Sequence, residues 1–175
     1  MLLVNYYRRI SEKFFTGDSN VEIEVGFAKL LVASPIDMAM VLQEKSGPRS
    51  ITISISGLTY FYMKKLMSGD EPSSPNIFGF AGELTQALAA SLQKIVIWDI
   101  NDDTTFEAYA TVADDRADRT YNLPILITDG VVLALSLNRP IFILEEIFKK
   151  AHDMLTRDQA IRTFANMDTD KVTKH

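Results

Sequence analysis

Apolar and polar residues alternate along three segments of the first half of the chain, and such alternation is typical of strands. VEIEVGF (21–27) places its aliphatic and aromatic side chains on one face and its glutamates on the other. MAMVLQEK (38–45) and ITISIS (51–56) follow, each after a turn that contains serine and proline. SGLTYFYMKKLMSG then predicts a helix that begins after Ser56 and ends at Gly69, because serine caps helix N-termini and glycine tolerates the left-handed conformation at C-termini.

The second half repeats this order after DEPSSPN (70–76), a stretch that we expect to join two halves of one domain. Leu84, Leu88 and Leu92 recur at helical spacing and predict a helix over 80–92 with one apolar stripe. The remaining segments predict, in order, strands over 93–100, 105–113 and 119–127, a helix over 129–137, a strand over 140–144 and a helix over 145–155.

Both halves contain a junction at which an alternating strand runs into serine or threonine and then glycine, ISISG (53–57) and ILITDG (125–130). This order of elements predicts an α+β fold with a largely antiparallel sheet. We expect two related three-strand-plus-helix halves, packed face to face, with the helices packed on the sheet. The domain would span 21–155, with an N-terminal helix in 1–20 and a C-terminal helix and tail in 156–175.

Composition and charge narrow the class of protein. The chain has 175 residues, of which 47% are hydrophobic, so it can bury the core of one domain. It contains no cysteine, which excludes disulfides and thiolate chemistry and suits the cytoplasm, the location that we expect. No uncharged apolar run reaches about 18 residues, so we expect no membrane partner. The net charge of −5, with basic residues in scattered pairs, argues mildly against a strong nucleic-acid binder.

Two sets of residues with metal-binding side chains, the stretch 99–107 and the two histidines, do not form convincing metal sites. DINDDTTFE (99–107) carries oxygen ligands at the first, third and fifth positions of a calcium loop. However, Thr104 stands at the glycine position and Ala110 at the position of the bidentate glutamate. His152 and His175 are too few for a zinc site, and no G-x-S-x-G motif accompanies them. We therefore interpret 99–107 as a polar hairpin turn.

Thr128 and Asp129 are the strongest candidates for chemistry, because they lie between a predicted strand and a wholly apolar helix. One interpretation is structural: Thr128 would be the helix N-cap, and the carboxylate of Asp129 would interact favourably with the helix dipole. The other is functional. A carboxylate at a solvent-facing strand-to-helix junction could hold a divalent metal or activate water, and the first interpretation does not exclude this role.

From Val21 to Ala151 the chain resembles the bifunctional nuclease domain family, whose α+β domains are credited with hydrolysing both DNA and RNA. The resemblance rests on four segments: ITISIS, ALAASLQKIVIWDI, TFEAYATV and, above all, TDGVVLALSLNRPIFILEEIF. The family segment that resembles this last one consists, in order, of a serine-aspartate pair, a helix of small apolar residues, a strand that begins with proline, and two acidic residues. The matching positions here are Thr128-Asp129, 130–135, 140–144 and Glu145-Glu146.

The chain departs from the family pattern at several polar positions. The family has Arg-Pro, His-Asp, a helix-opening glutamate and a strand glutamate, and the corresponding residues here are Leu126-Ile127, Phe78-Gly79, Thr59 and Tyr109. Asp129 keeps the family residue, and Thr128 is a mild substitution. Loss of a phosphate-binding arginine or a general base lowers hydrolytic rates by orders of magnitude.

The resemblance therefore implies two hypotheses. In the first, the chain hydrolyses DNA or RNA phosphodiesters with magnesium or manganese, Asp129 is the metal ligand or base, and Thr128 orients it. This hypothesis predicts that Asp129 meets other carboxylates and at least one lysine or arginine. In the second, the chain is a catalytically inactive interaction or regulatory domain that assembles as a homo-oligomer through 59–67 and the N-terminal helix.

Overall fold

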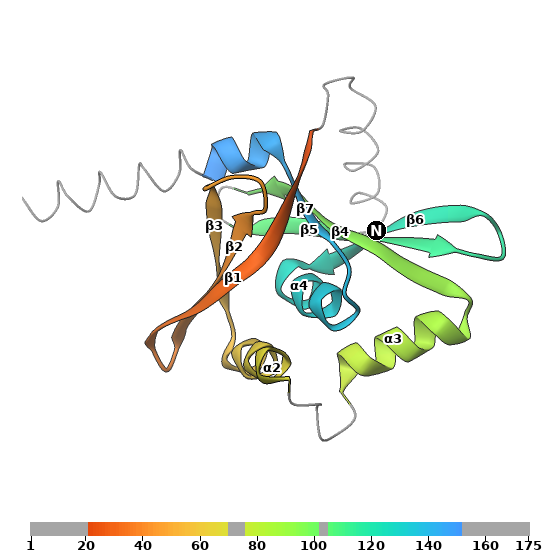
Figure 1. The fold of residues 1–175 in the computed structure, drawn as a ribbon, viewed down its shortest axis with the longest axis horizontal. Coiled ribbons are helices and arrows are strands. Elements are labelled where there is room, and N and C mark those ends of the chain that lie inside the picture. The colour runs from red at the N-terminus through yellow and green to blue at the C-terminus, as the bar shows by residue number, and fades with distance from the viewer. Residues whose placement is uncertain (1–20, 70–75, 102–104, 152–175) are drawn as a thin grey trace, which may run out of the picture.

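The computed structural model describes residues 21–69, 76–101 and 105–151, which form one seven-stranded sheet with helices packed on it (Figure 1). The strands are β1 (Glu22–Ser34), β2 (Asp37–Glu44), β3 (Ser50–Ile55), β4 (Ala90–Ile100), β5 (Phe106–Asp114), β6 (Arg119–Leu126) and β7 (Ile141–Leu144). The helices are α2 (Gly57–Ser68), α3 (Ile77–Ala87) and α4 (Ile127–Ser136), and 145–151 is also helical.

The strand order across the sheet is β3-β2-β1-β7-β4-β5-β6. All neighbouring strands are antiparallel except β4 and β7, which are parallel. The predicted α+β class and the largely antiparallel sheet are therefore confirmed.

The first half, β1-β2-β3-α2, folds as its polarity pattern predicts. The three isoleucines of β3 are buried, and the serines and threonine between them are exposed. The Oγ of Ser56 accepts a hydrogen bond from the backbone N–H of Thr59 at 3.1 Å, and Gly69 ends α2 at φ 70°. Both ends of this helix lie where the sequence placed them, because each end has a residue suited to it.

The second half, β4-β5-β6-α4, repeats the same order, but the two halves do not pack face to face as expected. They lie side by side in one sheet, because β7 is inserted between them, antiparallel to β1 and parallel to β4. β7 has four apolar residues and three of them are buried. A buried strand needs hydrogen-bond partners for its backbone on both edges, and the two meanders provide them.

The centre of the molecule is α4, which packs against β4, β5 and β6 and also contacts α2 and α3. In Figure 1 α4 lies between the two groups of strands, with α2 and α3 below it. Ile127, Val131 and Ala134 are buried on α4 at the helical spacing i, i+4, i+7. This apolar stripe fixes the orientation of α4 and hence of the polar residues in its first turn.

Helix α3 differs from the helix that the sequence predicts over 80–92. It begins after Asn76, whose side-chain oxygen accepts hydrogen bonds from the N–H groups of Phe78 and Gly79 at 3.0 and 2.9 Å. It ends at Ala87, and Ala89, which has φ 51° in the left-handed region, turns the chain into β4. Leu92 is therefore a buried strand residue, and the predicted extent of the helix is wrong.

The face that α3 turns toward the rest of the protein is small rather than leucine-rich. Gly82 is its buried residue, and a Cβ there would lie 2.9 Å from Cδ2 of Leu137 at the end of α4. Leu84 and Leu88, which the sequence placed in one apolar stripe of the helix, are exposed.

Several predictions lie outside the described residues. They concern the helix in 1–20, the helix and tail in 156–175, and the histidines at 152 and 175. The middle of the 99–107 turn also lies outside them. Within the described ranges, no helix combines the length and the apolar character that a membrane span requires.

Candidate functional site

Thr128 and Asp129 lie in the first turn of α4, which follows β6 directly. The N-cap is Leu126, at φ −62° and ψ 132°, and no side chain makes a capping hydrogen bond. The prediction that Thr128 caps the helix is therefore wrong: Ile127 belongs to the buried stripe, so the helix begins early enough to include it. Asp129 occupies the first turn, as predicted, where its charge complements the helix dipole.

Gly130 allows this turn to approach the sheet closely. A Cβ at this position would lie 3.2 Å from the Cγ2 atoms of both Ile95 on β4 and Ile125 on β6. Only a residue without a side chain fits at that separation without displacing its neighbours. The glycine therefore determines how near the preceding pair, Thr128 and Asp129, lies to the strand ends.

Thr128 and Asp129 are both half-buried, and neither side chain has a hydrogen-bond or ion-pair partner among the described residues. No group of three or more histidine, aspartate or glutamate side chains suited to a metal ion exists in that part of the chain. The expected patch in which Asp129 meets other carboxylates and a cation is thus absent from the described ranges.

A smaller donor set remains compatible with a hard divalent cation. Magnesium is commonly held by one or two protein carboxylates, while substrate phosphates and water complete the octahedron. Asp129 provides one carboxylate, and Thr128 provides a neighbouring hydroxyl. These two residues can therefore supply the protein part of a metal site that depends on the substrate for its other ligands.

Most of the positions at which the chain departs from the family pattern carry side chains that make packing or local contacts. The ring of Phe78 contacts that of Tyr62 edge-on, with 5.5 Å between centroids. Tyr109 is fully buried on β5, and the Thr59 hydroxyl lies 3.0 Å from the Oγ of Ser56. Leu126, in contrast, is largely exposed beside the first turn of α4. None of these side chains supplies a carboxylate or an imidazole.

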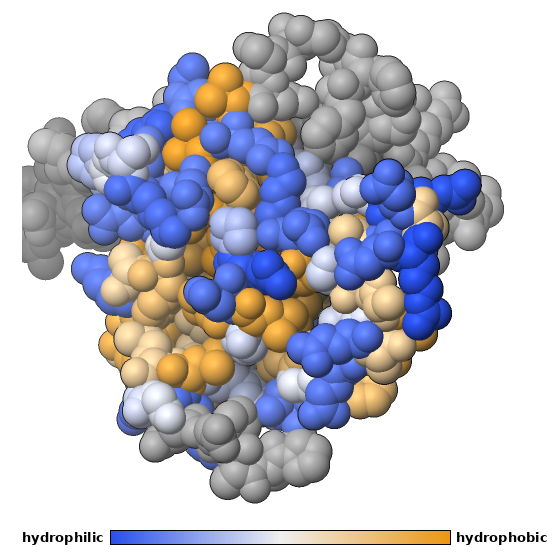
Figure 2. Space-filling view, turned by 45° about the vertical axis from the view of Figure 1, so that its right-hand side comes forward, coloured by the Kyte–Doolittle hydropathy of each residue, from blue (hydrophilic) through white to orange (hydrophobic). Residues whose placement is uncertain are grey.

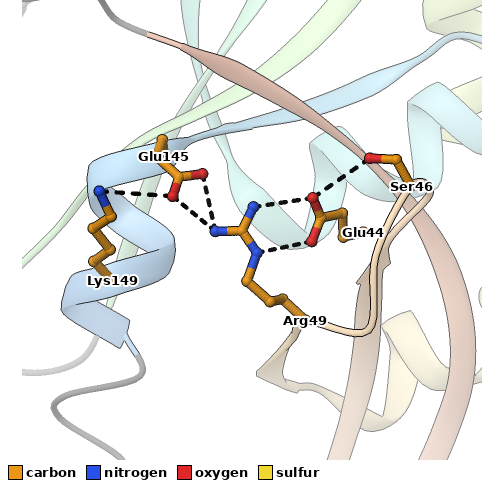
Figure 3. A network of polar contacts seen from close by, with 5 residues as sticks. All are labelled: Glu44, Ser46, Arg49, Glu145 and Lys149. Carbon is orange, nitrogen blue, oxygen red and sulfur yellow. Dashed lines mark hydrogen bonds and ion pairs between the residues drawn. The ribbon is translucent and has the colours of Figure 1, made fainter.

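A polar network that the sequence analysis did not predict joins the β2–β3 turn to the helical segment 145–151 (Figure 3). Arg49, in the β2–β3 turn, donates to both carboxylate oxygens of Glu44 at 2.8 and 3.0 Å. Its Nη1 also donates to both oxygens of Glu145 at 2.8 and 2.9 Å, and its guanidinium lies 4.7 Å from the centroid of the Phe148 ring. Lys149 adds a longer ion pair to Glu145 at 3.7 Å.

This network changes the electrostatics of all three of its central groups. Hydrogen bonds from Arg49 hold the pKa of Glu44 and that of Glu145 below their usual value of 4.5. The same bonds raise the pKa of Arg49 above its usual value. Glu145, one of the two acidic residues in the family-like segment, therefore joins the β2–β3 turn to the helical segment 145–151.

A second ion pair crosses β7. Lys94 on β4 donates to both carboxylate oxygens of Glu22 on β1 at 2.7 and 2.6 Å. Its Nζ also lies 5.4 Å from the centroid of the Phe142 ring on β7, the strand between them. Glu22 and Lys94 are 72 residues apart, and Arg49 and Glu145 are 96 apart, so no local sequence pattern indicates either pair.

Fold and site together define a class of protein: an α+β domain of two meander-and-helix halves, with a carboxylate in the first turn of the second-half helix. The sequence pattern of the bifunctional nuclease domain matches residues 40–155, and the chain belongs to that family. The match runs from β2 past the end of β7 and includes Thr128 and Asp129. The resemblance seen in the sequence is thereby confirmed. No curated protein matches the chain.

Proposed function

We propose that this protein hydrolyses phosphodiester bonds of DNA or RNA with the help of magnesium or manganese, and that Asp129 holds the metal. The observation that supports this proposal is the retained carboxylate in the first turn of α4, within the segment that matches the nuclease family. Thr128 precedes it in the same turn and would orient the carboxylate or the bound phosphate.

The N-terminus of α4 suits this role chemically. The first N–H groups of a helix lack partners within the helix, and no side chain caps those of α4. Such groups bind phosphate oxygens well, because the helix dipole also favours negative charge there. A bound metal would polarise the phosphoryl oxygen and make water more acidic. The half-buried Asp129 would hold that metal beside the phosphate, while the acidic net charge of the chain disfavours strong nucleic-acid binding.

A second candidate function is a catalytically inactive interaction domain. The observation that favours it is the use of Phe78 and Tyr109 for packing at positions where the family has polar side chains. A domain that has exchanged such residues for core contacts can keep its fold without its chemistry.

Hydrolysis assays with purified protein distinguish the two candidates. Single- and double-stranded DNA and RNA are incubated with magnesium or manganese and with wild-type protein, Asp129→Asn or Asp37→Asn. The substitution at Asp129 removes the negative charge but keeps the shape, and we expect it to lower the rate by at least about 100-fold. Asp37 is an exposed aspartate on β2, and its variant serves as the matched control, with an unchanged rate.

Equal rates in wild type and Asp129→Asn would show that the activity arises elsewhere and would contradict the proposal. The absence of hydrolysis by the wild-type protein with every substrate and both metals would favour the inactive interaction domain instead.

A further inference from the structure

The outward face of α3 is apolar. Ile77, Phe80, Leu84 and Leu88 follow one another at the helical spacing i, i+3, i+7, i+11 and are 63%, 58%, 44% and 60% exposed. In most surface helices the apolar stripe faces the core and polar residues face water. In α3 these four apolar residues instead face outward, and the contacts with the rest of the protein come from Gly82 and Phe78.

Helix α2 extends this apolar area. Leu58 and Phe61, one turn apart on α2, are 65% and 51% exposed. The ring of Phe61 contacts that of Tyr62 at 6.2 Å, and Tyr62 contacts Phe78 on α3 at 5.5 Å, so aromatic side chains connect the two helices. Apolar residues also reach the surface over the lower half of the space-filling view, the level at which α2 and α3 lie (Figure 2). We call the six exposed residues the α2–α3 surface: Leu58, Phe61, Ile77, Phe80, Leu84 and Leu88.

The size of the α2–α3 surface matches one side of a protein interface. From their exposed fractions, its six side chains present on the order of 700 Å² of apolar area. Each partner in a standard-size interface buries about 800 Å², and the largest apolar patch of a typical monomer is roughly 300–600 Å². With a modest polar rim, this surface is large enough for a stable dimer.

Charge on the two helices is complementary. The charged residues of α2 are Lys64 and Lys65, and that of α3 is Glu83. Leu58, Phe61 and Lys64 follow at intervals of three residues on α2, as Ile77, Phe80 and Glu83 do on α3. The two helices thus present similar rows, each with two apolar residues and a charge, and the charges are opposite.

We propose that the α2–α3 surface binds a second copy of this chain in a two-fold dimer, with α2 of each protomer against α3 of the other. A two-fold axis brings the same patch of both protomers together and produces each contact twice. Lys64 then faces the partner subunit's Glu83, and the reciprocal pair forms by symmetry. The apolar rows form the centre of the interface, and the charges lie at its rim, where they fix the register. This inference does not depend on the proposed hydrolysis.

Analytical ultracentrifugation of the full chain tests the dimer. The wild type is expected to sediment as a dimer at micromolar concentration, and Leu84→Asp as a monomer, with at least about a 100-fold higher dissociation constant, because a carboxylate would be buried without a partner. Ile36→Asp is the matched control, since Ile36 is 95% exposed on the β1–β2 turn, and this variant should remain dimeric. Circular dichroism confirms that each variant is folded.

A charge exchange tests the register and does not place a charge in the apolar centre. Lys64→Glu and Glu83→Lys are each expected to raise the dissociation constant several-fold, and the double variant should restore it. A monomeric wild type would overturn the proposal and assign the surface to another protein or to the terminal segments of this chain. A dimer that survives Leu84→Asp, or a double variant without rescue, would also overturn it.

Discussion

At the scale of single residues, the position of the candidate site depends on Gly130 more than on a helix-capping side chain. The first turn of α4 carries Asp129 but lacks a side-chain cap, so its position comes from the sheet beneath it. Gly130 permits that position, because the methyl groups of Ile95 and Ile125 occupy the space in which a side chain would lie. The role proposed for Asp129 would require accurate placement, and a residue without a side chain permits it.

We expect Gly130→Ala to destabilise the protein. The added methyl would lie 3.2 Å from the buried Ile95 and the partly buried Ile125, and overpacking of this kind costs about 1–3 kcal/mol. The better helix propensity of alanine offsets about 1 kcal/mol of that cost. Urea denaturation measures the net change. Gly57→Ala is the control, because a Cβ at Gly57 meets no atom within 4 Å, and its midpoint should stay equal or rise. A Gly130→Ala protein as stable as the wild type would show that α4 can shift away from the sheet.

At the scale of the elements, the sequence predicts those helix ends that carry a characteristic residue. The ends of α2 were correct because Ser56 and Gly69 mark them. The end of α3 was wrong, because Ala89 adopts a left-handed φ without being a glycine, and Leu92 continues the leucine spacing into β4. Asp129 was placed in the correct turn, since the change from alternating to wholly apolar residues marks the strand-to-helix junction.

Contacts between distant elements could not be predicted in the same way. The ion pair between Arg49 and Glu145 joins the β2–β3 turn to the segment 145–151 across 96 residues. A turn such as SGPR is compatible with a solvated arginine or with one held in ion pairs. Only the sheet order, which places β7 beside β1, brings the two groups together.

This ion pair predicts a pH dependence of stability. The pKa values of Glu44 and Glu145 are lowered in the folded protein, so the stabilisation is present above their ordinary value of 4.5. It is lost as the pH falls below that value and the carboxylates become protonated. Arg49→Met, which removes the charge but keeps a long unbranched side chain, should lower the urea midpoint near pH 7 and lower it much less near pH 3.

Denaturation series for both proteins between about pH 7 and pH 3 measure this difference. Arg116→Met removes an exposed arginine from the β5–β6 turn and should show a small effect at every pH. A difference between Arg49→Met and wild type that stays constant across the series would mean that the carboxylates contribute nothing through their charge.

At the scale of the whole molecule, β7 makes one unit of two similar halves. Its residues pair with β1 on one edge and with β4 on the other, and Lys94 reaches across it to Glu22. Each half alone is too small to bury a stable core, whereas the shared sheet provides one continuous core cluster. We therefore expect the two halves to unfold as one cooperative unit rather than as a pair of modules.

Cooperativity of this kind is measurable, because the chain has one tryptophan, Trp98 on β4, which reports on the second half. Its fluorescence and the far-ultraviolet circular dichroism should give the same midpoint in urea. Ile143→Ala, in β7, should lower both midpoints together and cost about 2–5 kcal/mol. Separate midpoints in either protein would show that the halves unfold independently.

The position of β7 in the sheet also has a consequence during synthesis on the ribosome. The strand at the centre of the sheet is the last of the described strands to be translated, so both meanders emerge before the strand that joins them. Until then β1 and β4 present open edges, and open edges pair readily with other chains. Nascent chains stalled before residue 141 should therefore depend more on chaperones than chains stalled beyond the end of the domain.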